Sequence, residues 1–256
     1  LMDRRNFLQQ STLAAVGLNT VAHSVVADQQ YYEWRIYELK SRGKTQVFDE
    51  YLQSAFIPAM NSIGVSNVGV FTEMGMPEPP RLHLLLTFSS LEEFAQSTSK
   101  VLEQAEYQQN SRSFAESASP ANPNFTRYES SLMRAFSAIP QLEAPAKSER
   151  IFEMRIYEGF NDDAVRRKIA MFNDDELPLF YETGLHPVFF GETLIGKKLT
   201  QLTYMLTFKD MAERDANWKK FIDHPEWKRM SALPKYANSV SRVNRIFLQP
   251  TAYSQI

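Results

Sequence analysis

The sequence contains no cysteine among its 256 residues. Without thiols the chain can form no disulfide, no zinc–thiolate or iron–sulfur site, and no cysteine nucleophile. It also lacks any run of about 18 apolar residues, which argues against a permanent membrane-spanning helix. The charges nearly cancel, at 28 basic against 30 acidic residues, so the basic surplus typical of nucleic-acid-binding proteins is missing. The rest of the composition is that of a folded globular protein.

Histidine is scarce as well, with four residues and no His-x-x-x-His pair. Acidic residues cluster at 162–163 and 174–176, but the sequence around them predicts a turn and a solvated helix face. We therefore predict no metal site. Composition leaves the identity of any other cofactor open.

Residues 1–27 differ in character from the rest of the chain. The pair Arg4-Arg5 is followed by Phe7-Leu8, a weakly apolar stretch and small residues up to Ala27. This order resembles a twin-arginine signal peptide, so we expect export by that route to the periplasm or another exported location, with a mature chain starting near Asp28. The alternative is the basic start of a surface helix.

A repeat organises the chain after this segment. The sequence EWRIYE at 33–38 recurs as EMRIYE at 153–158, and the same shift of 120 residues relates Pro58 to Pro178 and Gly64 to Gly184. Such a register predicts two related structural units. We place them at 31–136 and 151–250, separated by a linker at 137–150 that is rich in alanine, proline and charge.

Each unit has the pattern of a βαββαβ ferredoxin-like motif. Period-2 and helical spacings in the first unit predict strands at 31–39, 67–73, 82–88 and 127–136, and helices at 45–62 and 91–106. The fold class is therefore α+β. Two such units can pack sheet against sheet and form, within one chain, the barrel that a dimer of single units would form.

Four features taken together resemble the NIPSNAP family: the Glu-x-Arg-x-Tyr strands, the helix with Pro58 before Gly64, a third strand containing His83, and the segment HPEW at 224–227. The resemblance covers essentially all of 31–250, once per unit. It implies the fold of the dimeric α/β barrel superfamily, which also contains cofactor-free monooxygenases, heme-handling proteins and stress-response proteins. It implies no settled enzymatic activity.

Strand alternation divides the residues of each sheet between two faces. In the third strand, the apolar residues from Leu82 to Phe88 predict a helix-covered face and leave His83 facing the barrel. In the first strand, we expect the apolar Tyr32, Trp34 and Ile36 to pack against the helices. The polar set then faces the barrel beside His83; its members are Glu33, Arg35 and Tyr37, with Glu153, Arg155 and Tyr157 in the second unit.

We interpret this polar set as a ligand-binding cleft between the two sheets. The arginines would bind an anionic or carbonyl group, His83 would act as a catalytic acid or base, and the tyrosines would donate hydrogen bonds. In the structural alternative, the Glu and Arg of each pair neutralise each other on a half-buried sheet, and His83 is a core residue whose hydrogen bonds are satisfied.

Three functions remain open from the sequence. The first is an exported protein that binds a small ligand between its sheets; the second is a cofactor-free monooxygenase-like enzyme acting on an aromatic substrate. The third is a non-catalytic scaffold that binds a partner. We predict no nucleic-acid partner and no permanent membrane span, and a homo-oligomer is compatible with the sequence.

Overall fold

The computed structural model describes residues 28–198 and 200–256, so the predicted signal peptide at 1–27 lies outside the described residues. Each unit contains the predicted order of strands and helices. The first unit comprises β1 (Tyr31–Leu39), η1 (Arg42–Lys44), α1 (Thr45–Tyr51), η2 (Leu52–Phe56), α2 (Ile57–Ser62), β2 (Gly69–Glu73), β3 (Arg81–Phe88), α3 (Leu91–Leu102), α4 (Ala105–Asn110), α5 (Arg112–Glu116) and β4 (Phe125–Ala135). The second comprises β5 (Ile151–Glu158), α6 (Asp162–Met171), η3 (Phe172–Glu176), α7 (Leu177–Thr183), β6 (His186–Ile195), β7 (Gln201–Phe208), α8 (Met211–Asp223), α9 (Pro225–Ser231), η4 (Pro234–Tyr236) and β8 (Arg242–Pro250).

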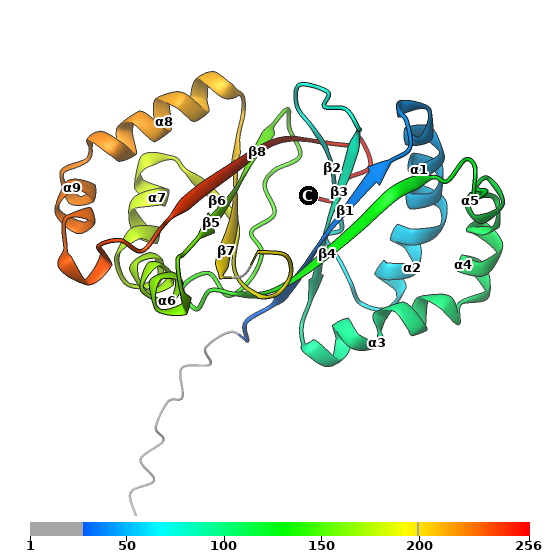
Figure 1. Cartoon of the computed structure of the whole chain (residues 1–256), viewed down its shortest axis with the longest axis horizontal. Helices are drawn as coiled ribbons and strands as arrows, with labels where there is room; N and C mark the ends of the chain where they lie inside the picture. The colour runs from blue at the N-terminus through cyan, green and yellow to red at the C-terminus, as the bar shows by residue number, and fades with distance from the viewer. Residues whose placement is uncertain (1–27, 199) are drawn as a thin grey trace, which may run out of the picture.

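The strands form one closed antiparallel barrel in the order β1-β3-β2-β8-β5-β7-β6-β4. Each unit contributes a four-stranded sheet, and the sheets join where β2 pairs with β8 and β4 pairs with β6. Helices α1–α5 lie on one side of the barrel and α6–α9 on the other (Figure 1). The predicted fold class, two ferredoxin-like units in one intrachain barrel, is confirmed.

The hydrophobic core has three parts. One part lies between the first sheet and its helices, a second lies between the second sheet and its helices, and a third fills the barrel interior. Both faces of every central strand are therefore buried against apolar neighbours. This double burial decides where the polar residues of β1 and β5 can go.

Helices α3 and α8 begin in the same way, which keeps the two units in register. Ser90 caps α3 by accepting a hydrogen bond from the backbone of Glu93, and Asp210 caps α8 through Glu213. In both helices the glutamate carboxylate also accepts from the backbone N–H of the residue preceding the cap. These reciprocal capping contacts fix each helix start against its sheet.

The long helix predicted at 45–62 is continuous but contains a π-helical segment, η2. The second unit has the equivalent segment, η3, at the same shift of 120 residues. A π-turn adds a residue to the helical repeat and redirects the side chains after it. The helices within 28–198 and 200–256 are all too short or too polar to span a lipid bilayer.

Candidate ligand-binding sites

The register of β1 against β3 decides which side chains face the barrel. Ile36 lies opposite His83, and Arg35 lies opposite Leu84. Directly opposite residues in antiparallel strands share a face of the sheet. Since Leu84 packs beneath the helices, Arg35 also lies on the helix side, together with Glu33 and Tyr37. The prediction that these residues face the barrel is therefore wrong.

The second unit repeats this orientation. Arg155 lies opposite Tyr204, which packs in the core beneath α6–α8. Glu153 and Tyr157 alternate with Ile156 and so share the face of Arg155. The prediction for Tyr32, Trp34 and Ile36 is wrong because the barrel interior is as apolar as the helix layer, and these three residues pack in it.

His83 faces the barrel as predicted. Its imidazole is fully buried, and its ring centroid lies 5.4 Å from that of Trp34. The Nε2 atom lies 2.8 Å from a carboxylate oxygen of Glu73, which also accepts a hydrogen bond from Arg81. Burial opposes ionisation of Glu73, but these contacts outweigh it and lower its pKa. The residue that orients His83 is thus Glu73. The predicted neighbours, Glu33 and Arg35, lie on the other face of the sheet.

In the first unit, Glu33 and Arg35 form a buried pair. Arg35 donates through Nε and Nη2 to the two carboxylate oxygens, at 2.7 and 2.8 Å. Ser130 donates to the same carboxylate at 2.7 Å, and the hydroxyl of Tyr128 does so at 3.3 Å. Although burial opposes its charge, Glu33 raises the pKa of Arg35. Burial also raises the pKa of Tyr128 to about 12, so Tyr128 is a neutral donor at neutral pH.

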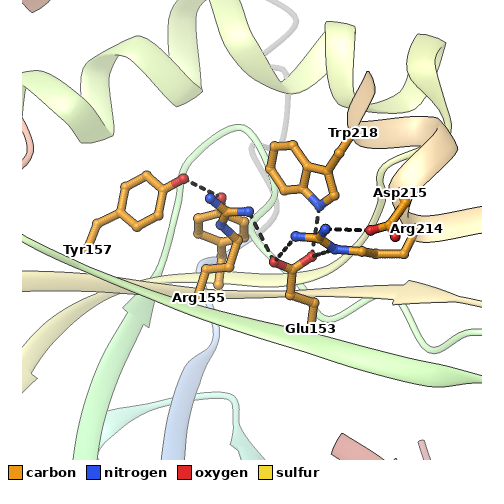
Figure 2. A network of polar contacts seen from close by, with 7 residues as sticks. Glu153, Arg155, Tyr157, Arg214, Asp215 and Trp218 are labelled. Carbon is orange, nitrogen blue, oxygen red and sulfur yellow. Dashed lines mark hydrogen bonds and ion pairs between the residues drawn. The ribbon is translucent and has the colours of Figure 1, made fainter. Parts of the chain in front are cut away.

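In the second unit, Glu153 is the centre of a larger network (Figure 2). It accepts two hydrogen bonds from Arg214, at 2.8 Å each, one from Arg155 at 3.0 Å and one from the indole of Trp218 at 2.7 Å. Burial opposes ionisation of Glu153, yet these donors hold its pKa below the usual range. The Arg155 guanidinium lies 4.1 Å from the centre of the Trp218 ring, a cation–π contact.

Arg214 and Trp218 were missed by the sequence reasoning. The shift of 120 places them opposite Phe94 and Thr98 of the first unit, so the difference between the units was visible in the sequence. Its meaning depends on α8 lying directly over β5, which the sequence does not show.

A buried ion pair also distinguishes the second unit. Lys168 Nζ lies 2.6 Å from Glu176, and both side chains are buried. Burial raises the pKa of Glu176 in spite of this partner. The prediction that 174–176 forms a solvated helix face is therefore wrong at Glu176, because η3 turns this carboxylate inward. Nowhere in 28–198 and 200–256 do three His, Asp or Glu residues gather as a metal site would require.

A pocket of about 240 Å³ opens at one end of the barrel, between the two sheets. We call it the barrel-end pocket. Apolar side chains from both units form its floor, and most of its polar side chains lie at the more exposed rim. The floor comprises Trp34, Ile36, Met133, Met154 and Ile156, the rim comprises Glu129, Ser131, Glu158, Lys197, Lys198 and Asn244, and the buried Gln201 and Thr203 complete the lining.

Trp34 is the notable member of this pocket. Trp34 is only 4% exposed, and its indole Nε1 has no hydrogen-bond partner among the described residues. A buried N–H without an acceptor costs about 1–3 kcal/mol. A residue of the pocket lining therefore carries a buried donor without an acceptor. At the rim, Lys197 pairs with Glu129.

A larger groove of about 580 Å³ runs along the linker, from Glu143 to Arg150, beside His186 and Lys209. Most of the linker side chains there are exposed. A ligand in this groove would remain largely hydrated, so the groove is a weaker candidate than the barrel-end pocket.

Solved structures similar to this chain include two proteins of the same overall size. One is a “putative monooxygenase” from Lactobacillus acidophilus NCFM, with a TM-score of 0.59, 7% identity, and coverage of 87% of this chain and 94% of that one. The other, also a “putative monooxygenase”, is from Fusobacterium nucleatum, with a TM-score of 0.58, 9% identity, and coverage of 87% and 93%. At these identities the likeness shows the fold alone.

A NIPSNAP-like domain protein from Burkholderia xenovorans is 21% identical over 41% of this chain and 89% of its own, with a TM-score of 0.38. A search of curated proteins found no match. The NIPSNAP family model matches residues 32–126 and 152–255, once in each unit. Since these matches cover most of the sequence, this chain belongs to the NIPSNAP family.

Proposed function

We propose that this protein binds a small, largely apolar ligand in the barrel-end pocket, in the cleft between its two sheets. The observation that carries the proposal is Trp34, which lines a pocket with an apolar floor and whose buried indole N–H has no acceptor among the described residues. Small-molecule sites commonly combine an apolar lining with a few placed polar groups.

The pocket constrains the chemistry of the ligand. Its volume of about 240 Å³ suits a molecule of one or two rings, smaller than a typical drug. An oxygen acceptor on such a molecule would satisfy the Trp34 N–H. The rim carries two lysines and two glutamates, so it favours a neutral molecule over a charged one.

Coumarin is a suitable probe, because it is neutral, has two fused rings and carries a carbonyl acceptor. We expect Trp34→Phe to weaken coumarin binding about 2- to 10-fold, which corresponds to the net value of one hydrogen bond, about 0.5–1.5 kcal/mol. Naphthalene has no such acceptor and should bind both forms alike. Isothermal titration calorimetry measures each affinity.

Trp227→Phe is the matched control, since it changes an indole on α9, away from the barrel-end pocket. Equal coumarin affinities for Trp34→Phe and the unchanged protein would remove the role of the indole. Absence of coumarin and naphthalene binding in the unchanged protein would count against the site itself and favour a scaffold, whose barrel serves only as a core.

A cofactor-free monooxygenase-like activity is the second candidate. The supporting observation is the Glu73–His83 pair, which faces the barrel interior next to Trp34. The two similar structures labelled as monooxygenases are consistent with this candidate. His83 would remove a proton from an electron-rich aromatic substrate, and O₂ would supply one oxygen atom to the product and one to water, with all electrons coming from the substrate.

Oxygen consumption with 1,4-dihydroxynaphthalene tests this candidate. Turnover should be lost in His83→Gln and kept in His224→Gln, since His224 lies between α8 and α9 and not in the barrel. Turnover that is equal in both variants, or no faster than the buffer reaction, would exclude His83 as the base.

Export by the twin-arginine route is also part of the proposal, and it rests on Arg4-Arg5 and the weakly apolar stretch that follows. Replacing both arginines with lysine should leave the folded protein in the cytoplasm. The measurement is the distribution of the protein between cytoplasmic and exported fractions. Unchanged export of this variant would refute the route.

A further inference from the structure

A second cavity lies in the first unit, between the sheet and the helices. Its volume is about 100 Å³, and it is separate from the barrel-end pocket because it lies on the opposite face of β1. Its lining combines one guanidinium, two tyrosines that hydrogen-bond each other at 2.9 Å, and apolar side chains. The lining residues are Arg35, Tyr51, Phe56, Met60, Ser97, Thr98, Val101, Leu102 and Tyr107.

Larger side chains stand at the equivalent positions of the second unit. At the shift of 120 residues, Trp218 takes the place of Thr98, and Phe221 takes the place of Val101. Trp218 is 8% exposed and covers Arg155, where Thr98 leaves Arg35 at the cavity wall. The capping contacts described above show that α3 and α8 share the same register, so the comparison holds residue by residue.

The buried charges balance in both units. Glu33 pairs with one arginine in the first unit, so the pair is neutral. Glu153 pairs with Arg155 and Arg214 in the second unit, and Asp215 pairs with Arg214, so that set is neutral as well. A negatively charged ligand in the first cavity would meet a buried carboxylate that is already paired. A neutral ligand would not be repelled.

Arg35 lines the cavity, and Glu33 does not use all of its N–H donors. Its Nε and Nη2 atoms form the bidentate pair with Glu33, which leaves Nη1 outside that pair. A guanidinium carries five N–H donors. Across the cavity, Phe56, Met60 and Val101 provide an apolar wall.

We propose that this cavity is a second binding site, selective for a small neutral carbonyl compound, and that Trp218 closes its counterpart. The carbonyl oxygen accepts from Arg35, and the alkyl part packs on the apolar wall. A cavity of about 150 Å³ holds benzene, so the smaller volume here suits a molecule of about five heavy atoms.

Butanone is the probe, and saturation-transfer NMR measures its binding. We expect Thr98→Trp to weaken butanone binding at least 10-fold, because the new indole fills the cavity as Trp218 fills its counterpart. Ala95→Trp is the matched control, since Ala95 is an exposed residue of the same helix that does not line the cavity. It should leave butanone affinity unchanged.

Val101→Phe copies the second unit in a different way and should also weaken binding, which keeps the test valid if Thr98→Trp fails to fold. Butanone binding to folded Thr98→Trp or Val101→Phe at the original affinity would overturn the proposal, as would no binding to the unchanged protein. Tighter binding of butyrate than of butanone would overturn the proposed selectivity for a neutral ligand. Saturating coumarin should not displace butanone, so the two sites are tested independently.

Discussion

Lys168 and Glu176 form a buried ion pair at the positions where the first unit has Phe48 and Phe56, which lie 120 residues earlier in the sequence. An aromatic pair in one unit and an ion pair in the other thus occupy equivalent buried positions on the helices. The Lys168 ammonium also lies 4.3 Å from the centre of the Phe172 ring. The two units solve the same packing problem with different chemistry.

We predict that Lys168→Met alone will destabilise the protein by about 3–5 kcal/mol, because it leaves the Glu176 carboxyl buried without its partner. The double variant Lys168→Phe/Glu176→Phe copies the first unit and should be less destabilised than Lys168→Met. Urea unfolding followed by circular dichroism gives both free energies. A double variant that is less stable than the single one would show that the charge pair is required by its surroundings.

Trp218 stabilises the second unit through its N–H as well as its ring. Trp218→Phe keeps an aromatic ring over Arg155 but removes the donor to Glu153. We expect a loss of about 1.5–3 kcal/mol, the range for hydrogen bonds to charged groups. Trp227→Phe removes no donor to Glu153 and serves as the comparison. The prediction fails if the two variants unfold at the same urea concentration.

The pH dependence of stability should reflect Glu153. Its pKa in the folded protein is lowered from 4.5, so its contribution is present above about that pH and is lost as the pH falls through the lowered value. Glu153→Gln does not titrate, so the stability gap between the two proteins should narrow as the pH falls from neutral to below 4.5. Thermal unfolding across this range measures the gap. A constant gap would contradict the assigned ionisation.

Two glycines with the same backbone conformation should respond differently to alanine. Gly184 has φ +79° and a Cβ there would lie 2.9 Å from Asn217, whereas Gly75 has φ +81° and a Cβ there would meet no atom within 4 Å. The left-handed conformation costs an alanine about 1–2 kcal/mol at either site. Gly184→Ala should therefore lower the melting temperature more than Gly75→Ala does. Equal effects would show that Asn217 moves aside freely.

The sequence predicted the elements of the first unit closely, since β1 has the predicted bounds and the helix at 45–62 is present with its π-helical segment. The second predicted helix ends earlier, at Leu102, and a short α4 follows. Alternation was informative in β3 because Leu82, Leu84 and Leu86 share one side. It was misleading in β1, where both sides are buried and hydrophobicity alone does not distinguish a barrel from a helix layer.

The candidate sites were less accessible to sequence reasoning. His83 was placed correctly on the barrel side, but its partner Glu73 comes from β2, and the pairing of β2 with β3 had to be known first. The barrel-end pocket draws on both units and on the 197–198 segment, so it depends on how the sheets close. Its apolar floor could not be predicted either, because Trp34 faces the barrel interior and not the helices.

Closure of the barrel within one chain has a consequence for symmetry. In an assembly of two identical chains, a substitution that fills one cavity must fill the other. Here β2–β8 and β4–β6 join two sheets that are encoded separately, so Thr98 and Trp218 can differ. One half can keep an open site while the other gives up that space for packing, a division of labour that a symmetric dimer of identical chains cannot reach by substitution.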